Sequence, residues 1–241
     1  MGGESIVNDE FKFSRVVFFG RSISEYVDMF DLDLEQLRGL AILDCAAGPA
    51  AFAAEAAAQS IHVTACDPMY EHTLPELRAM VDAHAEAVRA RQIEMMDLFH
   101  NEVVSVSDRR IAMEVFLNDF EQGKRVGRYQ TCTLPTLPFP DQAFEIALSG
   151  NLLFLYSDTE SGGMLEGSPF DYEFHRRSIF ELVRLVKRDV RIYPLQGPRV
   201  TTHKYIEPII AECRKDGLKA EVLPVAQRDI IGAENMLRIS R

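Results

Sequence analysis

The sequence predicts an α/β fold of the Rossmann-like, doubly wound type, with a mostly parallel seven-stranded sheet and an antiparallel last strand. Strand-like and helix-like segments alternate along most of the chain, which favours parallel strands joined by helical crossovers. The two final strand-like runs are separated by only about ten residues, too few for a helical crossover but enough for a hairpin. We therefore expect a single domain over residues 1–241.

The chain before the first strand and a stretch in its middle do not follow this alternation. Residues 1–38 are interpreted as an N-terminal helical segment. Residues 96–127 or thereabouts are interpreted as a helical insertion, because apolar side chains recur there near helical spacing. Gly123 and Gly127 mark the exit from this insertion.

The first strands and helices follow from composition. Ala41–Cys45 is a short apolar run, typical of a buried parallel strand. The alanine-rich run Ala50–Gln59 predicts a helix, and Ile61–Cys66 predicts a second strand that leads into Asp67. Pro75–Met95 then predicts a long helix.

The second half of the chain continues the pattern. One face of Arg177–Lys187 is apolar, which predicts a helix, and Tyr205–Lys215 predicts another that ends before Gly217. The remaining strands are predicted at Tyr129–Leu134, Phe144–Leu148, Val190–Leu195, Lys219–Val225 and Asn235–Ser240.

Composition and charge restrict the partners. The net charge is -11, from 37 acidic and 26 basic residues, which disfavours nucleic acid and anionic membrane surfaces. A small-molecule substrate is the expected partner. The four cysteines, Cys45, Cys66, Cys132 and Cys213, are widely spaced, which predicts reduced thiols, no metal site and a cytoplasmic location. Burial is expected for the first three, because they lie in or beside predicted strands.

The turn after the first strand is the strongest candidate for a ligand site. Ligands bind open α/β sheets at the carboxyl ends of strands, where the strand order reverses. Small residues follow Asp44 here and allow the backbone to approach a ligand closely. Asp67 closes the second strand, where a carboxylate can accept hydrogen bonds from both hydroxyls of a ribose. These features predict a cofactor that contains adenosine.

The turn also indicates which such cofactor is bound. It lacks the G-x-G-x-x-G pattern, and Pro49 removes a backbone donor that a pyrophosphate would use. A nicotinamide or flavin dinucleotide is therefore disfavoured, whereas S-adenosylmethionine has no phosphate and needs no such nest of donors.

Two motifs resemble those of class I S-adenosylmethionine-dependent methyltransferases. Leu43–Phe52 (LDCAAGPAAF) resembles the first motif of this family, with Gly48 as its central glycine and Ala46 where another glycine is common. Thr133–Ser149 resembles the family's Leu-Pro-Phe run, which leads into Phe-Asp and the fourth strand. An acid is common near the place that Thr133 occupies here.

The resemblance implies a set of cofactor contacts from four parts of the chain. In this family, a segment before the first strand packs over the cofactor. Here Arg21 would meet the methionine carboxylate and Tyr26 would cover the pocket, while Ser22 or Ser24 would cap a short helix. The other implied contacts are Asp44, Ala46, Gly48, Phe52, Asp67, Pro68, Thr133, Leu134, Ser149, Gly150 and Asn151.

The acceptor is expected after the fourth strand, where the family places substrate contacts. Tyr156, Asp158 and His175 are the candidate catalytic side chains. His175 suits a general base by its ordinary pKa, and Asp158 is an alternative base. The loop between Asp158 and Glu173 is acidic, which indicates either a mouth that attracts a cationic acceptor or a solvated loop.

The sequence leads to one principal function and two alternatives. The principal prediction is a methyltransferase that uses S-adenosylmethionine and acts on a small molecule. One alternative is a protein that binds the cofactor without catalysis, as a sensor or scaffold, and the other is an oxidoreductase dependent on NAD(P).

Overall fold

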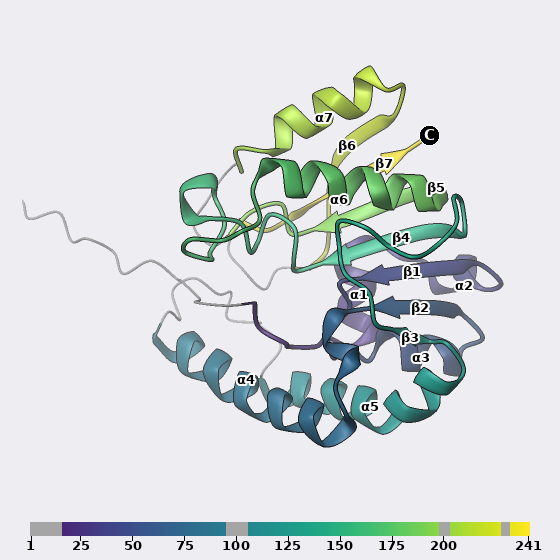
Figure 1. Ribbon diagram of the computed structural model, residues 1–241, viewed down its shortest axis with the longest axis vertical. Coiled ribbons are helices and arrows are strands. Elements are labelled where there is room, and N and C mark those ends of the chain that lie inside the picture. The colour runs from purple at the N-terminus through teal and green to yellow at the C-terminus, as the bar shows by residue number, and fades with distance from the viewer. Residues whose placement is uncertain (1–15, 95–105, 198–202, 228–231) are drawn as a thin grey trace, which may run out of the picture.

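The structure is a computed structural model that describes residues 16–94, 106–197, 203–227 and 232–241. Its strands form one seven-stranded sheet with the order β3-β2-β1-β4-β5-β7-β6 (Figure 1). The strands are β1 Ala41–Cys45, β2 His62–Cys66, β3 Tyr129–Gln130, β4 Phe144–Gly150, β5 Val186–Tyr193, β6 Lys219–Pro224 and β7 Asn235–Ser240.

The predicted mixed sheet is confirmed. Strands β1 to β5 pair in parallel, whereas β7 lies between β5 and β6 and is antiparallel to both. The short connection between β6 and β7 therefore forms the expected hairpin. In the register of the central strands, Asp44 faces Ala65 and Leu148, so the chain segments that follow β1, β2 and β4 emerge at one edge of the sheet.

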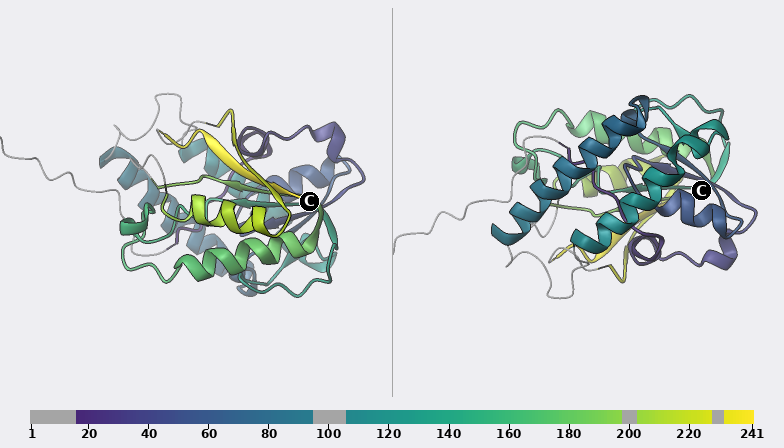
Figure 2. Two further views of the ribbon diagram at one scale, coloured as in Figure 1. Left: turned by 90° about the horizontal axis from the view of Figure 1, so that it is seen from above. Right: turned by 90° about the horizontal axis from the view of Figure 1, so that it is seen from below.

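Helices cover both faces of this sheet. The helices are α1 Ile23–Phe30, α2 Leu34–Leu37, α3 Phe52–Ala58, α4 Leu74–Glu94, α5 Val106–Arg125, α6 Tyr172–Leu185 and α7 Ile206–Lys215, with short 3-10 turns η1 Pro68–Glu71 and η3 Thr159–Ser161. Helices α4 and α5 pack side by side and cross the face of the molecule that is seen from below in the right panel of Figure 2.

Two apolar cores lie on opposite faces of the sheet. Alternation along the strands divides the side chains between them: Ile42 and Ile146 join the core under α1, α3, α4 and α5, whereas Leu43 and Ala147 join the core under α6 and α7. Because both faces are covered, β1 reads as a continuous apolar run rather than an alternating one.

Several predicted boundaries are wrong for local reasons. Strand β3 ends at Gln130. The chain then turns at Pro135, and an isolated β-bridge pairs Thr133 with Thr136 across this turn. Strand β5 begins at Val186, directly after α6, although the sequence predicted helix through Lys187. Lys187 is an exposed residue of β5, and an exposed polar residue at this position also suited the solvent face of the preceding helix.

The helices show similar shifts. Helix α3 begins at Phe52, because the two residues before it complete the turn, and α6 begins at Tyr172, because the Asp171 side chain caps it. The insertion predicted at about 96–127 contains α5, and its residues 96–105 lie outside the described residues, as do residues 1–15 of the predicted N-terminal segment.

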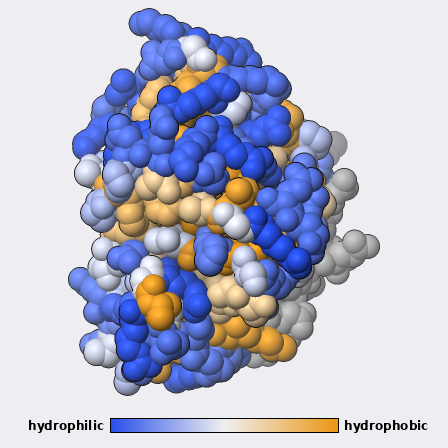
Figure 3. Space-filling model, turned by 90° about the vertical axis from the view of Figure 1, so that its right-hand side faces the viewer, coloured by the Kyte–Doolittle hydropathy of each residue, from blue (hydrophilic) through white to orange (hydrophobic). Residues whose placement is uncertain are grey.

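The face at the amino ends of the parallel strands is mostly hydrophilic, with small apolar patches (Figure 3). The chain segments that follow β1, β2 and β4 lie at the opposite edge of the sheet. No helix within the described ranges combines the length and apolar composition that crossing a bilayer requires.

Candidate active site

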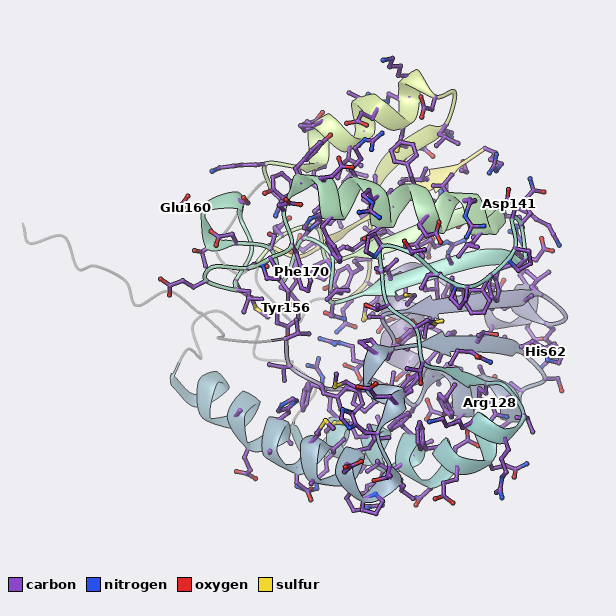
Figure 4. All side chains as sticks on the ribbon, in the orientation of Figure 1. His62, Arg128, Asp141, Tyr156, Glu160 and Phe170 are labelled. Carbon is purple, nitrogen blue, oxygen red and sulfur yellow. The ribbon has the colours of Figure 1, made fainter. Side chains whose placement is uncertain are left out.

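A cavity of about 390 Å³ opens at the carboxyl edge of the sheet. It is bounded by the turn after β1, the end of β2, the segment before β4 and the chain that follows β4. Residues 16–21, which we call the strap, close it from a further side. Tyr156 and Phe170 lie at this edge in Figure 4, whereas His62, Arg128 and Asp141 lie at the opposite one.

The turn after β1 has an open inner surface. Gly48 adopts a left-handed conformation with φ +57°, and a Cβ atom added there would meet nothing within 4 Å. The Gly48 N–H donates to Asp67 Oδ2 (2.9 Å), and the Tyr70 hydroxyl donates to the Gly48 carbonyl (2.6 Å). Contacts from the chain after β2 therefore fix the turn while leaving room beside it.

The strap crosses this turn at very short range. A Cβ atom on Gly20 would lie 2.0 Å from the Pro49 carbonyl oxygen, so no other residue fits there without movement. The Ala51 N–H donates to the Arg21 carbonyl (2.9 Å), and the Ile23 N–H donates to Glu55 Oε2 (2.6 Å). These bonds attach the strap and the start of α1 to the first turn of α3.

Asp67 lines the cavity with both carboxylate oxygens in use. Its Oδ1 accepts from the Met69 N–H (2.9 Å), and its Oδ2 accepts from Gly48. Burial raises the pKa of Asp67 to about 6, although both backbone bonds lower it. Each carboxylate oxygen has a second acceptor site, so the group can still accept hydrogen bonds from a diol in the cavity.

Asp44 lies directly beneath the lining and is fully buried. Its Oδ2 accepts from the Tyr26 hydroxyl (2.9 Å), but no donor among the described residues reaches its Oδ1. Burial raises the pKa of Asp44 to about 7, against the lowering effect of the Tyr26 bond. Asp44 therefore acts through Tyr26 and does not line the cavity.

Helix α1 and the residue before its cap bring two predicted cofactor residues to the cavity wall. Ser22 caps the helix, because its side chain accepts from the Glu25 N–H while the Glu25 side chain accepts from the Ser22 N–H. Arg21 and Tyr26 both line the cavity. The Tyr26 ring stacks on Phe52 at 4.3 Å, so Phe52, which is outside the lining, supports the wall from behind.

The remaining predicted cofactor residues divide in the same way between lining and support. Ser149 is fully buried in β4 and does not reach the cavity. The residues that do line the cavity are Ala46, Pro68, Thr133, Leu134, Gly150 and Asn151.

Of the candidate catalytic residues, only Tyr156 lines the cavity. Its hydroxyl accepts from the Val17 N–H of the strap (3.2 Å), and burial raises its pKa to about 12. The carboxylate of Asp158 caps η3 and also accepts from the Gly167 N–H (2.8 Å), away from the cavity. Its role as a base therefore has no geometric support.

His175 is fully buried and holds the loop after β4 in place. Its Nε2 accepts from the Phe154 N–H (3.0 Å), so its Nδ1 carries the proton and donates to the Asp171 carbonyl (2.7 Å). Burial lowers the pKa of His175. Both nitrogens are occupied outside the cavity, so the structure does not bring this candidate base to the lining.

A serine–histidine contact nearby is also structural. The Tyr205 N–H donates to His203 Nδ1 (3.1 Å), so the proton of the neutral ring lies on Nε2, beside Ser157 Oγ. The Ser157 hydroxyl in turn donates to the Phe154 carbonyl (2.9 Å). Because His203 donates to Ser157, it does not activate Ser157 as a nucleophile.

The cavity also contains side chains that sequence reasoning missed. His84 of α4, Arg109 of α5, and Phe170 and Phe174 around the start of α6 all line it. The prediction of buried reduced cysteines is confirmed, and Cys45 and Cys132 additionally reach the lining. No local pattern marks Arg109, because only the packing of α5 against the sheet turns it inward.

The strand order places the cavity at the point where the sheet changes direction. Numbering falls from β3 to β1 on one side of the cavity and rises from β4 on the other, and the antiparallel β7 completes the arrangement. The fold is that of class I S-adenosylmethionine-dependent methyltransferases. Among the described residues, no group of three or more His, Cys, Asp or Glu side chains could hold a metal ion.

No family model matches the sequence. The uncharacterized protein MJ0045 of Methanocaldococcus jannaschii is 28% identical over an alignment of 202 residues, which covers 81% of this chain and 85% of that protein.

Solved methyltransferase structures resemble the chain at low sequence identity. Magnesium protoporphyrin IX methyltransferase from Synechocystis PCC 6803, with bound S-adenosylmethionine, is 14% identical at a TM-score of 0.45, covering 86% of this chain and 72% of that one. A methyltransferase from Aquifex aeolicus is 11% identical at a TM-score of 0.38, covering 89% and 90%.

Proposed function

We propose that the protein binds S-adenosylmethionine in the cavity at the carboxyl edge and transfers its methyl group to a small molecule. The observation that supports this most directly is the open turn at Gly48 beside the cavity-lining carboxylate of Asp67. The space next to Gly48 allows a ligand to approach the backbone, and the carboxylate provides acceptors for ribose hydroxyls.

The lining residues suit the separate parts of this cofactor. Asp67 would accept from the ribose hydroxyls, and Thr133 and Leu134 would flank the adenine. Arg21 would meet the carboxylate of the methionine part in a charge-assisted bond. Tyr26 would cover the cofactor, with Asp44 orienting its hydroxyl.

The reaction requires alignment more than proton transfer. The bound cofactor supplies a methyl group on a positively charged sulfur. The protein's contribution is to hold an acceptor atom in line with that carbon and to exclude water. The strap supports this role, because Val17 bonds to Tyr156 and the Phe18 N–H donates to His84 Nδ1 (2.8 Å), which closes the cavity on that side.

Cofactor binding without catalysis is a second candidate function. It is favoured by the positions of Asp158 and His175, since neither predicted base reaches the cavity. A screen of acceptors that detects the release of S-adenosylhomocysteine separates the two functions. Turnover with any acceptor would exclude the sensor or scaffold.

Isothermal titration calorimetry tests the cofactor assignment. We expect S-adenosylmethionine and S-adenosylhomocysteine to bind and NAD(P) not to bind, because Pro49 removes a backbone donor from the turn. Folded protein that binds neither adenosyl compound would contradict the proposal. Tighter binding of NAD(P) would favour the oxidoreductase instead.

Substitution of Asp67 provides the sharper test. We expect Asp67→Ala to weaken the binding of S-adenosylhomocysteine by about 1–3 kcal/mol, because hydrogen bonds from the ribose are lost. Asp67→Asn is the matched variant that keeps the shape of the side chain. Asp216→Ala, at an exposed position after α7, is the control and should leave affinity unchanged. Unaltered affinity in both Asp67 variants would overturn the assignment.

A further inference from the structure

Three of the four cysteines gather at the carboxyl edge of the sheet, and we call them the thiol cluster. Cys45 ends β1 and pairs in register with Cys66, which ends β2, so both side chains point to the same face of the sheet. Cys132 follows β3, whose Gln130 pairs with Cys66. The fourth cysteine, Cys213, belongs to α7, which packs on β6 at the other end of the sheet.

The thiols of the cluster interact with one another, and Cys66 takes the middle position. The Cys66 thiol interacts with the Cys132 thiol and with the Cys45 thiol. Both interactions, together with burial, raise the pKa of Cys66. Cys66 therefore stays protonated and lies beside two other sulfur atoms.

Cys132 is the member of the cluster that is suited to react. It lines the cavity and remains 9% exposed, whereas Cys66 is 0% exposed. The interaction with the Cys66 thiol lowers the pKa of Cys132, against the raising effect of burial. At Cys45 the same interaction is outweighed by burial, and the pKa of that thiol is raised. Because the thiolate is the nucleophile, Cys132 attacks an electrophile more readily than its two neighbours do.

The position of Cys132 also matters for the cofactor. Cys132 directly precedes Thr133 and Leu134, and all three residues line the cavity. On the proposed function, Thr133 and Leu134 flank the adenine. A bound cofactor would therefore cover the Cys132 sulfur.

From these observations we propose that Cys132 is a thiol-modification site inside the cavity, that a small-molecule disulfide reacts there, and that Cys66 resolves the adduct as a Cys66–Cys132 disulfide. Bound S-adenosylmethionine shields Cys132 from this reaction. The shielding rests on the proposed function, whereas the thiol chemistry does not.

Both steps are thiol–disulfide exchanges, and they balance with the small disulfide as the oxidant. The Cys132 thiolate forms a bond to one sulfur of this disulfide, whose sulfur–sulfur bond breaks, and the electron pair leaves on the other sulfur. Cys66 then attacks the Cys132 sulfur, and its proton passes to the second thiol that leaves. In total, two protein thiols are oxidised to one disulfide, and the small disulfide is reduced to two thiols.

Mass spectrometry of the intact protein, treated with hydroxyethyl disulfide and quenched with acid, tests this chemistry. We expect the wild type to lose the mass of two hydrogen atoms, and peptide mapping to place the new bond between Cys66 and Cys132. Cys66→Ala should instead retain a hydroxyethylthio group on Cys132. Folded wild-type protein that does not react, or that reacts first at Cys45, would overturn the proposal.

Variants of Cys132 connect the reaction to this side chain. Cys132→Ser and Cys132→Ala should each slow the oxidation at least about tenfold, and thermal denaturation checks that both are folded. Cys213→Ala is the matched control, because Cys213 is also buried but lies outside the cavity lining, and it should react like the wild type. Oxidation at the wild-type rate in both Cys132 variants would contradict the assignment.

Shielding by the cofactor separates the two possible failures. Saturating S-adenosylhomocysteine should slow the modification of Cys132 at least about tenfold, because only the unoccupied protein reacts. If calorimetry shows that S-adenosylhomocysteine does not bind to folded wild-type protein, the proposed function fails, while the reaction at Cys132 is still measured without it. If S-adenosylhomocysteine binds but the rate is unchanged, the cofactor does not cover Cys132 and the shielding is wrong.

Discussion

At the scale of single residues, Asp44 carries a clear energetic cost among the residues that the structure describes. It is fully buried, and only one of its carboxylate oxygens has a hydrogen-bond donor among the described residues. Burying an ionised carboxylate without sufficient partners is unfavourable, which explains the rise of its pKa to about 7. The fold therefore accepts a desolvation cost beside the cavity, which protonation of Asp44 relieves.

The desolvation of Asp44 predicts a pH dependence of the free energy of unfolding. Because the pKa of Asp44 is raised on folding, its stabilising contribution is complete below its ordinary value of 3.8 and is lost as pH rises towards about 7. Asp44→Asn removes this titration. We expect the free energy of unfolding of the wild type, relative to Asp44→Asn, to fall by on the order of 2–4 kcal/mol between pH ~4 and ~8.

Chemical denaturation of both ligand-free proteins across this pH range measures the difference. Asp216→Asn is the control, because Asp216 is exposed and its variant should follow the wild type. A constant difference between wild type and Asp44→Asn would show that Asp44 has an ordinary pKa.

At the scale of elements, the sequence predicted what local pattern determines. Apolar runs predicted where strands occur along the chain, and β1 and β7 were predicted with their observed bounds. Strand β3 was predicted too long, because its end depends on how the chain turns around Pro135 before β4. The junction of α6 and β5 was misplaced, because exposed polar residues suit either element.

The same limit applies to the candidate site. Gly48 and Asp67 could be identified because they lie in the turns that follow two predicted strands. Arg109 and Phe170 could not be identified, since their place in the lining depends on helices and loops far away in the sequence. His175 was chosen for its ordinary pKa, which burial within α6 lowers.

Helix α1 illustrates how an element positions the site. Its capping box joins Ser22 and Glu25, and Glu25 also receives the Arg109 Nε–H. The cap therefore influences both Arg21, which precedes it, and Tyr26, which lies one turn inside the helix. Stability of α1 and affinity for the cofactor should be linked.

We expect Ser22→Ala to lower the free energy of unfolding by about 0.5–2 kcal/mol and to weaken the binding of S-adenosylhomocysteine as well. Thermal denaturation and calorimetry measure the two effects. Asp216→Ala, at an exposed position after α7, is the control and should change neither quantity. If Ser22→Ala destabilised the protein without altering affinity, α1 would not position the cofactor residues.

At the scale of the whole molecule, two buried histidines connect the loop after β4 to distant segments. His175 in α6 holds the Phe154 N–H, and His203 before α7 contacts Ser157. Their rings lie 5.9 Å apart. The Phe154 N–H donates to His175 Nε2 and the Tyr205 N–H donates to His203 Nδ1, and both bonds require neutral rings. Burial lowers the pKa of His203 to about 3. The two histidines therefore fix the loop that carries Tyr156. Burial lowers the pKa of His203 but raises the pKa of Asp44, so the two groups change the stability of the fold in opposite directions as pH rises.

The signs of the two effects differ, which predicts maximum stability at an intermediate pH. Because the pKa of His203 is lowered on folding, its contribution is complete above its ordinary value of 6.5 and is lost as pH falls towards about 3. We expect the wild type to lose on the order of 2–3 kcal/mol more stability than His203→Gln between pH ~7 and ~4. Glutamine can still donate to Ser157, so the two proteins should differ mainly in the titration of His203.

Chemical denaturation at both pH values tests this prediction. His62→Gln, at an exposed position of β2, is the control and should follow the wild type. Parallel losses in all three proteins would show that protonation of His203 does not release the loop.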